Sequence, residues 1–242
     1  SSVCSSSWRS PRSMGAVAAE RGIGQEVQPF GRDLHPAAGA FAIGAKRDAA
    51  QGGLDLAHSS GLYIGAWTSS VDFGDDFKTR QELEYYAGYF WQATDAISLD
   101  LGYIKYDYPK EAQFNLSEVY AILDLYGVKL GTYYSSDTPN VFGEDQDTFY
   151  AYLGYTLALP AEFGLDLRVG RNDVKDEAFV SPNGDSRSTY YEWEAKLTRD
   201  FLGVNWGLSY IDTNLKKSEC ANWYGFDDLC SATVVVSASK AF

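Results

Sequence analysis

Only two side chains in this sequence could act as an imidazole base, because only two histidines occur among its 242 residues. His58 is followed directly by Ser59 and Ser60, whereas His35 lies in an N-terminal stretch rich in Ser, Arg, Ala and Gly. A nucleophilic serine needs an imidazole and an orienting carboxylate or amide within mutual reach. Adjacent His and Ser residues in a short turn do not provide that arrangement, so we predict that the protein is not an enzyme.

The cysteines are the other reactive side chains, and their spacing argues against metal binding. Cys4, Cys220 and Cys230 form no CxxC pair, so we predict no zinc site and no other metal centre. Cys220 and Cys230 bracket one polar segment, where they could form a disulfide in an oxidising compartment or remain thiols. The stretch 31–39 lacks the Gly-Lys-Ser/Thr ending of a phosphate-binding loop. We therefore expect no cofactor.

Acidic residues dominate the charge, with 33 Asp and Glu against 20 Lys and Arg and a net charge of −13. No basic stripe is interleaved with aromatic residues, so nucleic acid is not an expected partner. Acids gather in four polar segments: Asp72, Asp75 and Asp76; Glu144, Asp145 and Asp147; Asp173, Asp176 and Glu177; and Asp227 and Asp228. Such oxygen clusters can hold calcium, but none has a calcium-loop spacing, so we expect a solvated anionic rim.

Apolar residues alternate with polar ones from Gly53 onward. In 163–170, for example, apolar side chains occupy every odd position, and Gly, Asp or Arg occupies every even one. A period of two predicts strands with one apolar and one polar face. Eleven such segments can be traced, at 53–58, 61–71, 81–92, 96–107, 117–125, 128–135, 147–159, 163–171, 189–199, 203–212 and 231–242.

The connections between these segments alternate between short and long. The long ones are 72–80, 108–116, 136–146, 172–188 and 213–230, and they are rich in Asp, Asn, Gly, Pro and Ser. Tight periplasmic turns and extended external loops are typical of outer-membrane barrels. Aromatic residues make up 15% of the chain, which suits rings placed at two membrane interfaces but also a soluble β-sandwich. No run approaches the roughly 20 apolar residues of a spanning helix.

The favoured fold is therefore all-β, an antiparallel up-and-down transmembrane β-barrel of about twelve strands. Even strand number requires one more strand before residue 50, and GAFAIGA at 39–45 is the only candidate. We divide the chain into a flexible or aberrant N-terminal arm, 1–38, and a barrel, 39–242. The last strand ends on Phe242, a terminal aromatic that resembles the signal read by the barrel-assembly machinery.

Strand parity turns the polar faces toward the inside of such a barrel. The expected lumen-lining residues are nine acids and three bases: Asp55, Glu82, Glu84, Asp100, Glu118, Asp124, Asp166, Glu192 and Glu194, with Lys129, Arg168 and Lys196. These groups could fill a narrow lumen with ion pairs and hydrogen bonds. Alternatively, a water-filled path remains, and the acid excess then favours cations.

Several stretches resemble a proteobacterial family known as TorF-family porins. They are GGLDLAHSSGLYIGAWTSSVDFGDD (52–76), ELEYYAGY (82–89), YTLALPAEFGLDLRVG (155–170) and VVVSASKAF (234–242). These are strand-and-turn patterns without catalytic residues. The resemblance implies an outer-membrane barrel with a pore function.

Three functions remain in competition. The first is a porin-like channel for ions or small solutes in the bacterial outer membrane, in contact with membrane lipid and lipopolysaccharide. The second is a non-transporting barrel that serves envelope structure or surface contacts through its acidic loops. The third is a soluble β-sandwich that binds ligands through exposed aromatic side chains. The sequence leaves the oligomeric state open.

Overall fold

The structure is a computed structural model that describes residues 38–44, 48–71, 78–139, 144–175, 178–224, 227 and 230–241. The predicted arm, apart from Ala38, and the predicted assembly signal Phe242 lie outside these residues.

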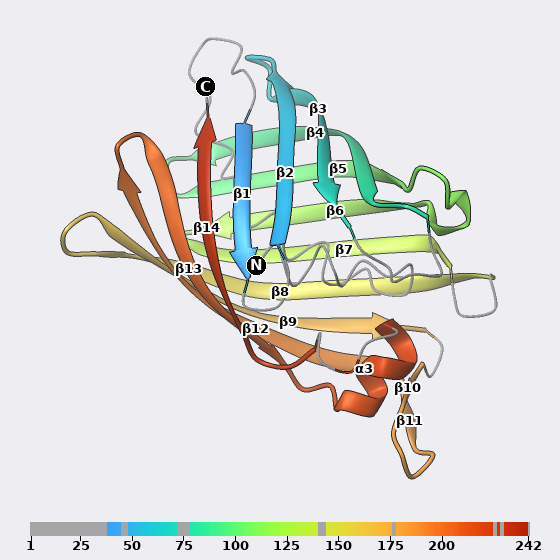
Figure 1. The fold of residues 1–242 in the computed structure, drawn as a ribbon. Helices are drawn as coiled ribbons and strands as arrows, with labels where there is room; N and C mark the ends of the chain where they lie inside the picture. The colour runs from blue at the N-terminus through green and yellow to red at the C-terminus, as the bar shows by residue number, and fades with distance from the viewer. Residues whose placement is uncertain are drawn as a thin grey trace.

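Twelve antiparallel strands close into a barrel, in which each strand pairs with its neighbours around the ring. In Figure 1 the near strands β1, β2 and β14 cross the far strands β6 to β8 steeply, as tilted barrel strands do. The barrel strands are β1 (Ala38–Gly44), β2 (Asp48–Ala57), β3 (Leu62–Ser70), β4 (Gln81–Thr94), β5 (Ile97–Asp107), β6 (Leu116–Leu125), β7 (Val128–Pro139), β8 (Asp145–Leu159), β9 (Phe163–Val174), β12 (Thr189–Phe201), β13 (Val204–Thr213) and β14 (Thr233–Ala241).

Closure depends on β1, the strand that the sequence required only on grounds of parity. β1 pairs with β2 on one side and with β14 on the other. Its first residue, Ala38, is opposite Ala241, so both ends of the barrel sequence lie at the end with the short turns. The predicted twelve-stranded up-and-down barrel is thus confirmed, with the first strand at Ala38–Gly44.

The two faces of the wall differ as the alternation predicts. On β9 the side chains of Leu167 and Val169 are 41% and 46% exposed, whereas Glu192 and Glu194 on the adjacent strand β12 are 3% and 5% exposed. Apolar side chains therefore point outward and acids inward. None of the helices in the described part of the chain is long and apolar enough to span a membrane.

Short turns fix the register of neighbouring strands. Tyr126 and Gly127, which join β6 to β7, both have positive φ, at 56° and 83°. Leu202 and Gly203 repeat this between β12 and β13, at 56° and 71°. Two positive φ values in a two-residue turn match the right-handed twist of the flanking strands. A slip of one residue would turn every apolar side chain inward, so these turns protect the two faces.

Three of the long connections contain further structure that was not predicted from the sequence. Polar loops were expected at 172–188 and 213–230, but the first of these connections contains the hairpin of β10 (Phe179–Val180) and β11 (Ser186–Arg187). The second contains the helix α3 (Lys217–Tyr224), and Figure 1 shows hairpin and helix together at one end of the barrel. A 3-10 helix, η1 (Ala112–Phe114), lies between β5 and β6.

Glycines on the inner face make room for tyrosine rings from the adjacent strand. Gly131 on β7 pairs with Tyr152 on β8, and a Cβ placed on Gly131 would overlap the Tyr152 ring. Gly154 on β8 also faces inward, but a Cβ there would meet its nearest atoms at 3.6 Å, an ordinary contact. The two glycines are therefore a matched pair for substitution, because the Tyr152 ring lies directly over Gly131 but not over Gly154.

We predict that Gly131→Ala lowers the free energy of unfolding by about 1–3 kcal/mol, the usual cost of overpacking. Gly154→Ala on the next strand should change it by less than about 0.5 kcal/mol. The measurement is urea unfolding in detergent micelles. Unfolding is monitored by the gel mobility of unheated samples. Equal stability of the two variants would contradict the ring-over-glycine packing.

Candidate functional site

The inner wall of the barrel is the candidate site, because all of the predicted lumen residues lie on it. Six of these side chains are buried: Glu82, Glu84, Glu118, Glu192, Glu194 and Lys196. The other six are partly exposed: Asp55, Asp100, Asp124, Lys129, Asp166 and Arg168. Their lumen-lining role in transport remains a prediction, but the structure does bring them to one surface.

Each base of this set has an acid directly opposite in the strand register. Lys129 on β7 pairs with Asp124 on β6, and Lys196 on β12 pairs with Asp166 on β9. Arg168 pairs with Glu194, and its guanidinium lies 2.9 Å from the Glu194 carboxylate. Opposite charges on facing positions of two strands attract one another. Three of the nine acids are thereby matched by the three bases.

Five of the six remaining acids accept a hydrogen bond from a tyrosine hydroxyl. A carboxylate removed from water is costly unless a donor replaces the water, and O–H donors to a carboxylate make short, strong bonds. The donors and acceptors are Tyr86 to Asp55, Tyr63 to Asp100 (2.5 Å), Tyr108 to Glu82, Tyr106 to Glu118 (2.9 Å) and Tyr150 to Glu192 (2.5 Å).

Three of these tyrosines reach past a neighbouring strand. Tyr86 on β4 lies over Gly65 on β3 and donates to Asp55 on β2. Gly65 pairs with both residues, so the three positions are in register. Because the glycine has no side chain, the tyrosine ring can lie along the wall instead of across the lumen.

The other two crossings repeat this arrangement. Tyr63 on β3 passes over Gly88 on β4 to reach Asp100 on β5. The Tyr150 hydroxyl on β8 lies at Gly170 on β9 and donates to Glu192 on β12. Each tyrosine therefore connects strands that do not share backbone hydrogen bonds.

Tyrosines also pack against one another to form a band along the inner wall. The rings of Tyr120 and Tyr133 are stacked with centroids 5.3 Å apart, and those of Tyr133 and Tyr150 are 6.2 Å apart. The strand register places Tyr133 opposite both partners. The Tyr63 hydroxyl is hydrogen-bonded to that of Tyr120, which extends the band to β3. Tyr63 and Tyr133 are not among the lumen-lining residues predicted from the sequence.

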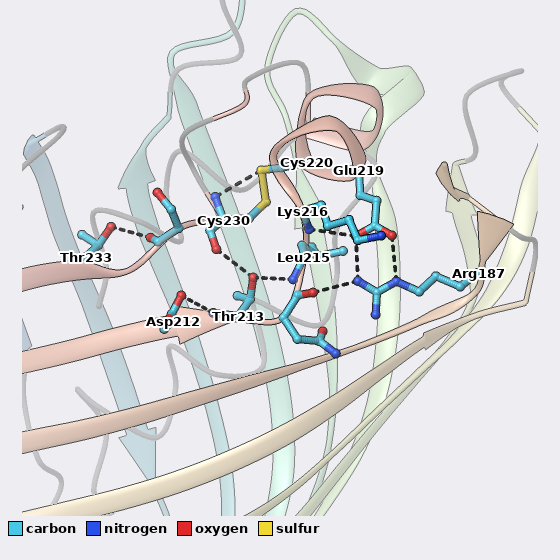
Figure 2. The surroundings of a disulfide bond; sticks show 11 residues. Arg187, Asp212, Thr213, Leu215, Lys216, Glu219, Cys220, Cys230 and Thr233 are labelled. Atoms are coloured by element: carbon cyan, nitrogen blue, oxygen red, sulfur yellow. Dashed lines mark hydrogen bonds and ion pairs between the residues drawn. A yellow bond between two sulfur atoms is a disulfide. The ribbon is translucent and has the colours of Figure 1, made fainter. Parts of the chain in front are cut away.

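A folded cap at one mouth of the barrel is the part of the site that the sequence did not predict. We define the loop cap as β10, β11 and α3 with the residues that join them to the barrel. Cys220 in α3 and Cys230 before β14 form a disulfide with an S–S distance of 1.93 Å. Figure 2 shows this bond beside Thr213, whose hydroxyl donates to the Cys230 carbonyl at 2.8 Å.

The apolar core of the loop cap includes inner-face residues of the barrel. Phe179 of β10 packs edge-on against Tyr190 of β12, with ring centroids 5.3 Å apart. Val174 at the end of β9 and the disulfide belong to the same buried cluster. Tyr190 and Val174 share the inward parity of Glu192 and Asn172. The loop cap is therefore anchored on the inner side of the mouth.

An ion pair connects the two halves of the loop cap. Arg187 of β11 donates two hydrogen bonds to the carboxylate of Glu219 in α3, at 3.0 and 2.7 Å. Figure 2 shows this two-pronged contact, with the Lys216 backbone N–H donating to the same carboxylate at 2.8 Å. Burial alone would raise the pKa of Glu219, but the hydrogen bonds from Arg187 and Lys216 outweigh it and lower the pKa.

The predicted anionic rim is only partly as expected. Asp145 and Asp173 belong to β8 and β9 rather than to loops, because these strands extend past their predicted ends. Asp147 lies 3.3 Å from Lys175, and Asp173 lies 2.8 Å from Arg171, so both acids have basic partners. The other predicted clusters fall partly or wholly outside the described residues: Asp72, Asp75, Asp76, Asp176, Glu177 and Asp228.

Two other chemistries were weighed from the sequence, metal binding and serine catalysis, and the described residues form the arrangement needed for neither. No group of three or more His, Cys, Asp or Glu side chains there is arranged to hold a metal ion. His58 lies exposed at the turn before β3, where its ring is 2.9 Å from the Ser60 hydroxyl. The Ser60 backbone N–H also donates to this ring, at 3.2 Å. These are the local hydrogen bonds of a polar turn.

The closed sheet, the outward apolar side chains and the charged inner wall define a β-barrel of the outer-membrane type. Solved structures share this fold. The NanC porin matches with a TM-score of 0.57 and 10% identity, over 86% of this chain and 100% of that one. The KdgM porin matches with a TM-score of 0.54 and 8% identity, over 85% and 98%. At these identities the likeness is one of fold alone.

The family follows from the sequence itself. A family model described as a bacterial protein of unknown function (Gcw_chp) matches residues 41–242, and the chain belongs to this family. No protein with a curated description matches the sequence.

The lowered pKa of Glu219 predicts how the loop cap responds to acid. A carboxyl group whose pKa is lower in the folded protein than its ordinary value of 4.5 stabilises the fold at pH values above 4.5. This stabilisation is lost as the pH falls through the lowered pKa of the folded state. We expect Glu219→Gln to speed amide hydrogen exchange in Lys217–Tyr224 about tenfold at pH 7, which corresponds to a loss of roughly 1.4 kcal/mol of local stability. The variant should also abolish the acid-induced loss of protection, measured after correction for intrinsic rates.

Glu111→Gln is the matched control for this prediction. A hydrogen bond from the Lys78 backbone N–H lowers the pKa of Glu111, which lies in the β5–β6 connection. This variant should leave exchange in α3 unchanged. An equal effect of both substitutions, or none of Glu219→Gln, would show that the ion pair does not hold the loop cap.

Proposed function

We propose that the protein is a porin-like channel of the bacterial outer membrane, through which ions or small solutes pass with a preference for cations. The observation that carries this proposal is the charge of the inner wall. The predicted lumen residues on this wall are nine acids and three bases, and nine minus three leaves six negative charges in this set, on a face enclosed by twelve strands. Rings of carboxylates in a confined path favour cations over anions.

The outer surface supports the membrane location. Its exposed side chains include Trp91, Leu153, Leu167, Val169, Trp193 and Trp206. Such a surface is stable in acyl chains, with aromatic rings suited to the two interfaces. We infer contact with outer-membrane lipid and lipopolysaccharide, and insertion by the barrel-assembly machinery with Phe242 as the signal.

The sequence resemblance to TorF-family porins points to the same function, and we propose that the chain is a porin of that kind. One of the similar structures is a KdgM porin in complex with disordered oligogalacturonate. The acid excess inside the present barrel disfavours a carboxylate-bearing solute of that type. The activity proposed is passage of solutes rather than catalysis.

A second candidate is a barrel that does not transport. It is favoured by the burial of inner-wall groups such as Glu82, Tyr106 and Tyr133, which are at most 1% exposed. A lumen filled in this way by its own side chains would serve the envelope as a rigid wall. Conductance separates the two candidates.

We expect purified protein to insert into planar lipid bilayers and give discrete conductance steps. In a tenfold KCl gradient the reversal potential should have the sign of a cation-selective channel, because the predicted lumen residues include six more acids than bases. The control is the same detergent extract without the protein. A reversal potential of the opposite sign would overturn the cation preference, and insertion without conductance would favour the second candidate.

A further inference from the structure

We propose that the loop cap is a lid that narrows the external mouth of the channel, held in place by the Cys220–Cys230 disulfide and the Arg187–Glu219 ion pair. This inference rests on the proposed channel function and specifies where along the barrel the passage is controlled. It follows from the uneven burial of the inner wall and from the residues against which the loop cap packs.

The inner wall formed by β9, β12, β13 and β14 is buried at one end and open to solvent at the other. At the end with the long connections, which is the external end of such a barrel, four inward residues are at most 7% exposed: Val174, Tyr190, Thr213 and Thr233. Toward the short turns, four inward residues of the same strands are partly exposed: Asp166, Thr198, Asn205 and Ser237.

This difference is not an effect of position along the strand. Each of the partly exposed residues lies further from the end of its strand than its buried counterpart does; Asp166 is the fourth residue of β9, for example, and Val174 is its last. A lumen filled evenly by its own side chains would be buried alike at both ends. The external end must therefore be covered by something beyond the strands themselves.

The loop cap covers these strand ends. Phe179 of β10 is completely buried, packs against Tyr190 and belongs to one buried cluster with Val174 and the disulfide. The Cys230 carbonyl accepts the hydroxyl of Thr213 at 2.8 Å. The loop cap thus lies against inward residues of β9, β12 and β13, at the end of the barrel where Figure 1 shows the hairpin and the helix. A solute that enters from outside meets it first on this side of the mouth.

The hairpin and the helix of the loop cap are joined into one unit. The Glu219 carboxylate accepts hydrogen bonds from Arg187 of β11 and, at 3.2 Å, from the hydroxyl of Ser181. The Asn222 side chain in α3 donates to the Val180 carbonyl of β10 at 3.1 Å. Loss of a contact that holds α3 therefore loosens the hairpin as well.

The disulfide connects this unit to the barrel wall. α3 has eight residues, and isolated helices shorter than about 12–15 residues are only marginally stable in water. Cys230 precedes β14 closely, so its bond to Cys220 ties α3 to a strand of the closed ring. A disulfide also restricts the segment between its cysteines when that segment unfolds. Removal of the bond should release α3 and widen the external mouth.

The test compares single-channel conductance in symmetric KCl. We expect the double variant Cys220→Ser with Cys230→Ser to raise the conductance step at least about twofold, because a constriction sets the conductance of a pore. Glu219→Gln keeps the disulfide but breaks the ion pair, and it should also raise the step. Glu111→Gln lies in the β5–β6 connection, outside the loop cap, and this matched control should change the step by less than about 1.2-fold.

Polyethylene glycols of graded size locate the effect. A polymer that is small enough to enter a mouth lowers the conductance when it is added to that side, so each mouth has its own size cut-off. Loss of the disulfide should raise the cut-off at one mouth and leave the other unchanged. An equal rise at both mouths would mean that the whole barrel has loosened, and it would overturn the inference.

The outcomes distinguish the lid from the function on which it rests. If neither the native protein nor any variant conducts ions, both fail. If the native protein conducts and the two loop-cap variants match Glu111→Gln, only the lid is overturned. Conductance that appears in the loop-cap variants alone would show a channel that the lid closes completely. Unheated gel mobility verifies that each variant is folded.

Discussion

Every backbone N–H and C=O within a lipid bilayer must find its partner inside the protein, and the rest of this structure depends on that constraint. An open sheet edge would leave such groups unpaired, at a cost of several kcal/mol each. The pairing of β1 with both β2 and β14 removes the edge. Once the ring is closed, strand alternation sends half of the side chains to lipid and half inside. The apolar outer face and the charged inner wall are two consequences of one closure.

Closure places the nine predicted carboxylates on one inner wall, where removing them from water is costly. Two kinds of contact offset that cost. Three acids lie opposite bases, as Glu194 does with Arg168 at 2.9 Å. Five others accept tyrosine hydroxyls, and glycines on neighbouring strands make room for the rings of three of these tyrosines. The high tyrosine content, 18 residues, therefore serves the inside of the barrel as well as its outer surface. Tyrosine suits this task because its ring tolerates a dry wall while its hydroxyl binds a carboxylate.

The barrel could be predicted from the sequence because its signals are local. Period-two alternation marked the segment 163–171, which is β9 from Phe163 to Val174, and strand parity identified the segment of β1. The loop cap could not be predicted, because Arg187 and Glu219 are 32 residues apart and nothing local indicates that they meet. The sequence likewise placed Asp55 and Asp166 in one set of lumen acids. Only the strand register shows that Asp166 lies opposite Lys196 whereas Asp55 lies opposite Gly65.

The tyrosine–carboxylate bonds do something that backbone ladders cannot. A ladder connects only adjacent strands, whereas Tyr86 connects β4 to β2 and Tyr150 connects β8 to β12, each across an intervening strand. Bonds that pass over a strand resist the change in angle between its two neighbours, which is the motion by which a small barrel flattens. Glu192 accepts a hydrogen bond from Tyr150 and forms an ion pair with Arg168, 3.7 Å away, so its charge is balanced within the wall. Asp55 accepts the same kind of bond from Tyr86 across Gly65, so this way of joining non-adjacent strands occurs on both sides of the barrel.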